Sequence, residues 1–251
     1  MSGHEGYTKL SDGRWKITAN HTLQAATPEM LDWWWDHIDT TERYRLWHPT
    51  DHVSFEWVVP PTLNGHVGAI HRVQEFFNGT PAEGPVALEI RWEDPTQAET
   101  HYSHVLLATG RGVQESMQNA TLMHEYEEMP NGTRMRSHFW FPSQAPEPAL
   151  AALYQHNRQE MARLPAFLPW LYQSEVELPL GKRYFTLGDQ RITRERISDS
   201  SGHAHLQYRL WDNWHEQVYH ITASSVPLLL ASQQIELTQW SWHLLEEGKH
   251  K

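Results

Sequence analysis

The sequence predicts an α+β fold in which a curved antiparallel sheet wraps around one long helix, with a C-terminal appendage after it. Two observations lead to this prediction. A series of strand-like segments, several with alternating apolar residues, extends from residue 53 to residue 141. A long helical segment follows them and begins near Leu150. Consecutive strands followed by one long helix favour a sheet that grips the helix and encloses a pocket.

Composition limits the class of function. The 251 residues are enough for one large domain with a sizeable core. The chain has 31 acidic and 20 basic residues, a formal net charge of −11, and no run of Lys and Arg, so no nucleic-acid partner and no membrane surface is expected. Because Cys is absent, any metal must take His and carboxylate ligands. The 18 His and 13 Trp suggest a cavity or interface lined by large rings.

The beginning of the chain carries no targeting signal that can be recognised. Residues 1–15 lack both a basic stretch and an apolar stretch. The longest apolar runs elsewhere are much shorter than a bilayer span. We therefore expect a cytoplasmic protein without a membrane anchor.

A strand and a helix are expected before the main run of strands. Residues 13–23 alternate weakly, with Trp15 and Ile17 on one side, which indicates a first strand. Thr27 is a suitable N-cap because Pro28 stands at the first helical position, so a helix should follow. We expect this helix to run toward residue 38.

The next segment mixes polar and aromatic residues. Residues 40–52 contain a proline and are typical of a short helix or turn, which should lead into a strand over residues 53–59. In the following strand, residues 67–77, alternation places Glu75 on a largely apolar face. Residues 86–92 then form a strand with one apolar face, after a loop rich in Gly and Pro.

A β-hairpin is the strongest local prediction. After a strand at residues 101–110, two strand-like arms flank Pro130-Asn131-Gly132, which is a strong turn signal. Alternation on the first arm turns His124 inward, together with Leu122 and Tyr126. A buried His either satisfies a hydrogen bond in the core or takes part in chemistry, and the pattern leaves both alternatives open.

The long helix carries a His and a Glu on one face. In residues 150–164, His156 and Glu160 are four residues apart, so they share a face with Leu153 and Leu164. A buried carboxylate beside a buried imidazole needs a compensating partner, and a divalent metal is one. The alternative is an ordinary surface pair on a helix. Prolines at 165 and 169 are expected to end or kink the helix.

The pattern changes after residue 174. Residues 191–197 and 203–211 are expected to form a hairpin, and residues 228–247 look helical with apolar residues on much of the surface. Such a segment needs to be covered, either by its own domain or by a second subunit. We therefore predict a domain over residues 1–174, an extension over residues 175–251 whose role stays open between a pocket cover and a dimerisation element, and a homodimer.

Three stretches and Glu75 carry a resemblance to a known family. The stretches are ERYRLWHPTDH, LMHEYEEMPNGTRMRSHFWF and HNRQEMARLPAFLPWLY, in this order. Together they resemble the 2,4-diacetylphloroglucinol hydrolase family, to which phloretin hydrolase belongs. The resemblance implies a helix-grip (Bet v 1-like, START-like) domain. It also implies a Zn²⁺-dependent hydrolase that cleaves the carbon–carbon bond between an acyl group and a polyhydroxylated aromatic ring.

The resemblance implies a set of site residues. His156 and Glu160 match the helical pair of metal ligands of the family, and His124 matches its catalytic histidine. His52 resembles the first metal ligand, with His48 as its competitor, and Glu75 resembles the first carboxylate ligand, with Glu83 as its rival. Tyr44 resembles a catalytic tyrosine that contacts the substrate. The set implied by resemblance is therefore metal: His52, Glu75, His156 and Glu160; catalytic: His124 and Tyr44.

The implied substrate is a small phenolic or aromatic ketone. His124 would move a proton to the ring or activate water, and Tyr44 would donate a hydrogen bond to a phenolate or an oxyanion. Two alternatives from other classes remain open. One is a non-catalytic carrier or sensor of aromatic ligands, and the other is a metal-dependent polyketide isomerase or cyclase on the same fold.

Overall fold

The computed structural model describes residues 5–62, 65–77, 84–113 and 119–177, together with the backbone of five further strands between residues 183 and 244. The chain divides into two compact units, Met1–Pro169 and Trp170–Lys251. Each unit contains its own antiparallel sheet. The candidate site lies entirely in the first unit.

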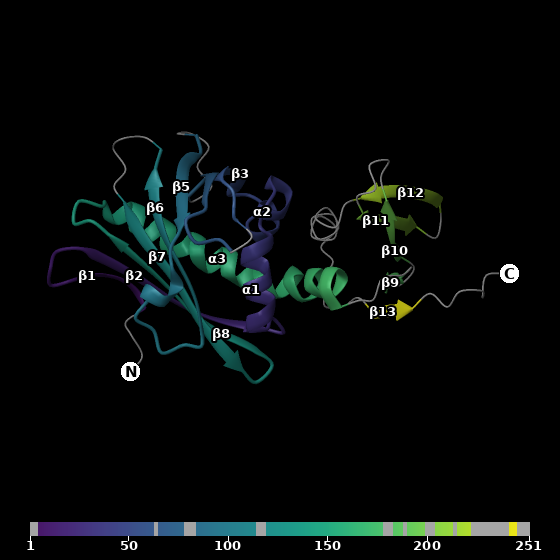
Figure 1. The fold of residues 1–251 in the computed structure, drawn as a ribbon, viewed down its shortest axis with the longest axis horizontal. Coiled ribbons are helices and arrows are strands. Elements are labelled where there is room, and N and C mark those ends of the chain that lie inside the picture. The colour runs from purple at the N-terminus through teal and green to yellow at the C-terminus, as the bar shows by residue number, and fades with distance from the viewer. Residues whose placement is uncertain are drawn as a thin grey trace. The chain divides into compact units, whose positions relative to one another are not determined.

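The first unit is built on an eight-stranded antiparallel sheet that curves around a long helix (Figure 1). The strand order across the sheet is β1-β2-β8-β7-β6-β5-β4-β3. The strands are β1 (Gly6–Lys9), β2 (Trp15–Gln24), β3 (His52–Val59), β4 (Ile70–Glu75), β5 (Val86–Trp92), β6 (His104–Gly112), β7 (Ala120–Met129) and β8 (Gly132–Phe141). This arrangement is the helix-grip fold, so the predicted fold class is confirmed.

In the described part of the first unit, three α-helices accompany the sheet: α1 (Pro28–His37), α2 (Thr41–Trp47) and α3 (Glu147–Tyr172). The hydroxyl of Thr27 accepts a hydrogen bond from the backbone N–H of Met30, which confirms Thr27 as N-cap of α1. A short 3₁₀ helix, η2 (Pro95–Gln97), lies between β5 and β6. None of the described helices is long and apolar enough to cross a membrane.

The β7–β8 hairpin forms where the turn signal predicts it. Asn131 has φ of 68° and Gly132 has φ of 152°, a region that favours glycine. A Cβ at position 132 would lie 2.1 Å from the carbonyl oxygen of Leu23 on β2, so the neighbouring strand also requires glycine here. The turn thereby sets the register that places His124 opposite Ser137.

The long helix does not end at its prolines. Pro165 and Pro169 both lie inside α3, which continues to Tyr172, so the expectation that they could end the helix is wrong. Each proline removes one backbone hydrogen bond. Leu164, Phe167 and Leu168 are nearly or completely buried around them, and this burial compensates for the lost bonds.

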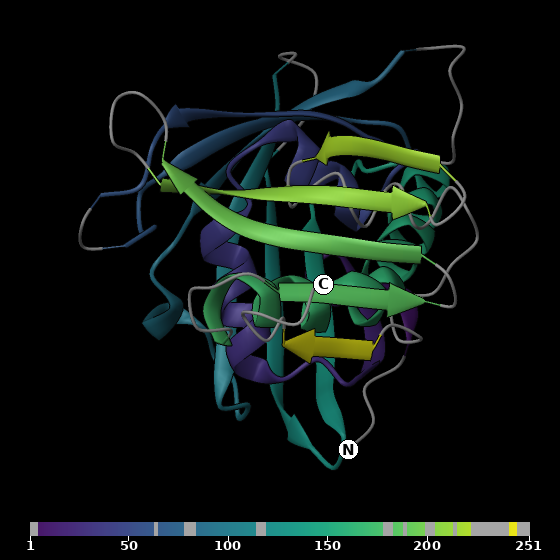
Figure 2. The ribbon, with the colours of Figure 1, turned by 90° about the vertical axis from the view of Figure 1, so that its right-hand side faces the viewer.

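The second unit contains a five-stranded antiparallel sheet of order β12-β11-β10-β9-β13, visible face-on in Figure 2. A π-helical turn, η3 (Gln173–Glu177), precedes it. The strands are β9 (Arg183–Leu187), β10 (Gln190–Ser198), β11 (Ala204–Asp212), β12 (His215–Ile221) and β13 (Ser241–Leu244). The pairing of β10 with β11 confirms the predicted hairpin.

The helix predicted over residues 228–247 is wrong at residues 241–244. This segment forms β13, which pairs with β9 from Ser241↔Thr186 to Leu244↔Arg183. Pairing with a distant strand overrides a local helical pattern, which a short apolar run cannot specify by itself. The other residues of the predicted helix lie outside the described part of the chain.

Candidate metal and catalytic site

A cavity of about 690 Å³ lies between the concave face of the sheet and the helices of the first unit. Its walls are mainly aliphatic and aromatic side chains, including Val86, Leu88, Ile90 and Trp92 from the predicted apolar face of β5. Polar side chains converge at one region of the wall, among them Glu75, His156 and Glu160. A largely apolar cavity with a few convergent polar groups is the usual form of a small-molecule site.

The sheet register brings two of the predicted ligands together. His52 begins β3 and Glu75 ends β4, and the two residues pair directly across the strands. His52 is 1% exposed, so its imidazole is held inside the protein. The inward face predicted for Glu75 is observed, since this side chain lines the cavity.

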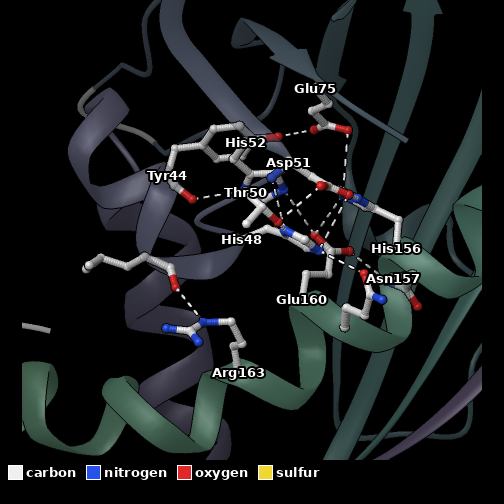
Figure 3. Close-up of polar contacts among 12 residues, drawn as sticks. Tyr44, His48, Thr50, Asp51, His52, Glu75, His156, Asn157, Glu160 and Arg163 are labelled. Atoms are coloured by element: carbon white, nitrogen blue, oxygen red, sulfur yellow. Dashed lines mark hydrogen bonds and ion pairs between the residues drawn. The ribbon is translucent and has the colours of Figure 1, made fainter. Parts of the chain in front are cut away.

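The helix α3 supplies the other two predicted ligands (Figure 3). Nε2 of His156 lies 3.8 Å from Oε2 of Glu160 and 3.8 Å from Oε2 of Glu75. Nε2 of His52 lies 3.6 Å from Oε2 of Glu160. These separations exceed hydrogen-bond range but are close to the roughly 3.3 Å edges of a tetrahedron of zinc ligands. The surface-pair alternative for His156 and Glu160 is excluded by their burial, at 3% and 6% exposure.

Each of these four side chains is oriented by a second group. Nδ1 of His52 donates to the backbone carbonyl of Tyr44 at 2.8 Å, and Nδ1 of His156 pairs with Oδ2 of Asp51 at 3.1 Å. Nδ2 of Asn157 donates to Oε1 of Glu160 at 2.8 Å, and the hydroxyl of Tyr44 donates to Oε1 of Glu75. Such outer partners fix the tautomer and direction of metal-binding groups.

The imidazole of His52 is neutral, as a histidine that binds a metal must be. Among the described residues its Nε2 is buried and has no hydrogen-bond partner. Burial lowers the pKa of His52 to about 3, against the opposing charge of Glu75, so its imidazole is neutral at pH 7. Because Nδ1 donates to a carbonyl, the lone pair is on Nε2. A buried lone pair 3.6 Å from the carboxylate of Glu160 needs a cation or proton between them.

The pKa values of His156 and Glu160 are both raised, whereas that of His52 is lowered. Burial would lower the pKa of His156, but the carboxylates of Glu160, Glu75 and Asp51 together raise it above its ordinary value. Burial raises the pKa of Glu160, and His156 partly opposes this. Two buried carboxylates near two imidazoles therefore compete for protons, and a divalent cation can replace those protons.

The competitor His48 is less suited to bind a metal than His52. Its Nδ1 accepts a hydrogen bond from the backbone N–H of Asp51 at 3.2 Å, so its proton is on Nε2, which lies 3.1 Å from Oε1 of Gln159. Both ring nitrogens are thus engaged. The rival carboxylate Glu83 lies outside the described residues.

Two groups of side chains in the described part of the chain could hold a metal ion. One is His52, His156 and Glu160, with ligand atoms within 4.8 Å of one another, and the other is His48, Asp51 and His156. In the second group, Nδ1 of His156 already pairs with the carboxylate of Asp51, and the ring nitrogens of His48 are engaged by the backbone N–H of Asp51 and the side-chain amide oxygen of Gln159. The first group, joined by Glu75, fits a borderline divalent ion by its donor set of two nitrogens and two carboxylates.

Tyr44 lines the cavity from α2 and is buried. Its ring stacks on His52 with centroids 3.8 Å apart, and its hydroxyl donates to Glu75. Burial raises the pKa of Tyr44 well above its ordinary value, and Glu75 adds to the shift, so the phenol keeps its proton. That Tyr44 contacts the substrate stays a prediction.

His124 lies on the inner face of β7, on the wall of the same cavity. It is 4% exposed, its ring stacks near Trp35 at 5.7 Å, and its Nδ1 lies 2.9 Å from Oγ of Ser137. Burial lowers the pKa of His124 to about 3, so the ring is neutral at pH 7. The inward direction agrees with the alternation of β7, whereas its catalytic role stays a prediction.

Sequence reasoning missed four polar residues of this region: His21, Asp51, Ser137 and Asn157. Asp51 and Asn157 are the immediate neighbours of His52 and His156 in the chain, and this adjacency is the sequence feature that could have identified them. His21 shares a strand face with Ile17, and Ser137 lies opposite His124 in the hairpin register. These partners follow from pairing between strands distant in sequence.

The fold and these side chains define a helix-grip protein with a buried histidine–carboxylate cluster beside an apolar cavity. The chain belongs to the family of the DAPG hydrolase PhiG domain, whose sequence model matches residues 1–173. The family expected from the sequence is therefore confirmed.

Individual proteins also resemble this chain. Phloretin hydrolase of Eubacterium ramulus is 25% identical over 204 residues, which cover 68% of this chain and 72% of that protein. Among solved structures, Ara h 8.0201 has a TM-score of 0.46 at 14% identity and covers 62% of this chain and 97% of its own. A START superfamily protein from Mycobacterium smegmatis has a TM-score of 0.43 at 15% identity, over 63% of this chain and 98% of its own.

Proposed function

We propose that this protein is a zinc-dependent hydrolase that cleaves the carbon–carbon bond between an acyl group and a polyhydroxylated aromatic ring. Membership of the DAPG hydrolase family and the similarity to phloretin hydrolase support the reaction class. The observation that carries the proposal is that ligand atoms of His52, His156 and Glu160 lie within 4.8 Å of one another, with Oε2 of Glu75 3.8 Å from Nε2 of His156. All four side chains face the interior and each has an outer partner.

The proposed reaction adds one water molecule to an aryl ketone. The carbon–carbon bond between the carbonyl and the ring breaks, the ring carbon gains a proton, and the acyl carbon gains a hydroxyl group. The products are a free acid and the deacylated phenol. Zinc, when bound, would act as a Lewis acid and lower the pKa of water. His52, Glu75, His156 and Glu160 would hold it.

The remaining residues bind and orient the substrate. Apolar side chains of β5 and the aromatic ring of Trp35 suit a flat phenolic ring and exclude water from it. His124 is a polar group on the sheet side of the cavity, available to an oxygen or a ring carbon of the substrate. Tyr44 keeps its proton and donates it in a hydrogen bond to Glu75, so it would stabilise negative charge on the substrate by turning this one hydrogen bond from Glu75 to the substrate oxygen.

Product analysis tests this function. Zinc-loaded protein is incubated with a small panel of acylated phloroglucinols in water labelled with heavy oxygen, and the products are identified by mass. The proposal predicts a free acid that carries one labelled oxygen and an equal amount of deacylated phenol. A product of unchanged mass would instead indicate an isomerase or cyclase, and bound but unconsumed ligand would indicate a carrier. Either result contradicts the proposal.

A further inference from the structure

A chain of hydrogen bonds connects the metal-site region to His124 through the wall of the cavity. Oε1 of Glu160 accepts from Nδ2 of Asn157 at 2.8 Å, and Oδ1 of Asn157 lies 3.1 Å from Nε2 of His21. The same nitrogen of His21 lies 3.1 Å from Oγ of Ser137, which lies 2.9 Å from Nδ1 of His124. We call Asn157, His21 and Ser137 the relay.

The relay joins elements that are distant in sequence. His21 lies on β2, Ser137 on β8, His124 on β7 and Asn157 on α3. Ser137 pairs with Ala19 of β2 on one side and with His124 of β7 on the other. Ser137 and Asn157 are completely buried, so water does not satisfy their polar atoms in place of the relay. The fold therefore holds the relay between a helix and three adjacent strands.

The amide of Asn157 sets the direction of every hydrogen bond in the relay. Its nitrogen donates to Oε1 of Glu160, so its oxygen faces His21. An amide oxygen only accepts, so Nε2 of His21 carries its proton. The opposite orientation of the amide would place its oxygen against the carboxylate, which repels it.

The same logic continues to His124. The single N–H at Nε2 of His21 is shared between Oδ1 of Asn157 and Oγ of Ser137, so the hydroxyl of Ser137 accepts there and is free to donate its own proton in the other direction. The group in that direction is Nδ1 of His124, which therefore accepts. A neutral imidazole has one donor and one acceptor nitrogen, so the proton of His124 is on Nε2. Burial lowers the pKa of His21 to about 4, which agrees with a neutral ring there too.

We propose that Asn157, His21 and Ser137 are positioning residues that hold His124 as the neutral Nε2–H tautomer, with its N–H directed to the substrate. In this state Nε2 donates a hydrogen bond and does not accept a proton. Of the two roles predicted for His124, activation of water at Nε2 is therefore disfavoured. A neutral N–H donor stabilises negative charge that develops on a substrate oxygen, such as a phenolate or the oxyanion at the acyl carbon.

The catalytic use of this tautomer rests on the proposed function, but the tautomer itself does not. Nitrogen-15 NMR of the ring nitrogens reports it directly. Zinc-loaded full-length protein with labelled histidines is compared with His124→Gln to assign the His124 signals, and long-range correlations show which nitrogen is protonated. We expect protonated Nε2 and unprotonated Nδ1. Protonated Nδ1 in the wild-type protein would overturn the proposal, whatever its activity.

Variants test whether the relay holds that state. His21→Leu removes the donor and should convert His124 to a mixture of tautomers, whereas His21→Gln offers an amide N–H in its place and should keep the Nε2–H form. Thr22→Ala, on the exposed neighbour in β2, is the matched control. If the Nε2–H form persists undiminished in both His21→Leu and Ser137→Ala, the relay does not determine the tautomer and the proposal fails.

Kinetics adds a second readout. With a hydrolysed acylphloroglucinol, His21→Leu should lower kcat by about 10- to 100-fold at nearly constant KM and metal content, and His21→Gln should restore most of it. An equal loss in both variants would indicate a merely structural role. If no substrate is hydrolysed by the wild-type protein, the proposed function fails while the NMR result still decides the tautomer.

Discussion

His52 and Glu75 face each other across the β3–β4 pair, the first residue of one strand opposite the last residue of the other. This pairing places an imidazole and a carboxylate at one end of the sheet, where α3 presents His156 and Glu160. The strand pair and the i,i+4 helical pair thus bring their polar side chains to the same region of the protein.

Loss of a helical ligand should remove the metal. We expect His156→Ala and Glu160→Gln to bind well below one equivalent of zinc, since each removes one of four ligands. Metal analysis after gel filtration measures this, with circular dichroism to verify folding. His48→Gln is the control, because both nitrogens of His48 are engaged in hydrogen bonds. Because His156 belongs to both clusters, metal loss in His48→Gln and His156→Ala with full retention in Glu160→Gln would place the ion in the other cluster.

Asp51, the hydrogen-bond partner of His156, should strengthen zinc binding without being essential for it. Asp51→Asn keeps an oxygen at the position that receives Nδ1 but removes the negative charge. We expect zinc affinity to fall by about 10- to 100-fold, measured by competition with a chelator of known affinity. The exposed Asp12→Asn is the matched control. Equal affinities in both variants would mean that Asp51 does not support the site.

His124 should act on substrate and not on metal. His124→Ala is expected to retain zinc and to lower kcat by about 10²- to 10³-fold, the usual loss for one hydrogen-bond donor to developing charge. Metal analysis and steady-state kinetics on the same preparation separate the two effects. Undiminished hydrolysis of an acylphloroglucinol would remove His124 from the mechanism.

His124 should also make folding sensitive to acid. Its folded-state pKa is depressed from 6.5 to about 3 by burial, so between these values the unfolded chain binds a proton that the folded chain does not. The stability contributed by the neutral ring is fully present above pH 6.5 and is lost as pH falls, by about 1.4 kcal/mol per pH unit. Urea unfolding of the wild type and His124→Phe at several pH values measures the difference. Parallel pH dependences of the two proteins would contradict it.

Much of the fold of the first unit is visible in the sequence because its signals are local. Alternation predicts β5 and the inner face of β7, and Asn131-Gly132 predicts the hairpin between β7 and β8. Thr27 and Pro28 predict the start of α1. These features depend on residues within one element or one turn. Their local preferences agree with the final structure.

The remaining elements depend on distant pairing. β1 has only four residues, too few to show a period, and it forms by pairing with β2. β13 pairs with β9 across more than fifty residues, which overrides the helical pattern of its own segment. The continuation of α3 through Pro165 likewise depends on burial of its neighbours and not on its local sequence.

In the candidate site too, some features follow from local sequence patterns and others depend on the pairing of distant segments. The pair His156 and Glu160 is detectable from helical spacing, and the inward direction of Glu75 from strand alternation. The choice between His52 and His48 needs the hydrogen bonds of each ring, which depend on α2, β3 and α3 together. The relay through His21 is likewise set by the register of β2, β8 and β7, which the residues alone do not specify.

The central claim is that the four-residue cluster makes this protein a metal-dependent carbon–carbon hydrolase. The most direct measurement is release of free acid from an acylphloroglucinol by the same protein preparation in zinc-loaded, chelator-stripped and zinc-restored form. We predict hydrolysis with zinc, its loss after stripping, and its recovery on restoration in proportion to bound metal, up to one equivalent. Equal rates of acid release in all three forms, with stripping verified by metal analysis, would contradict the claim.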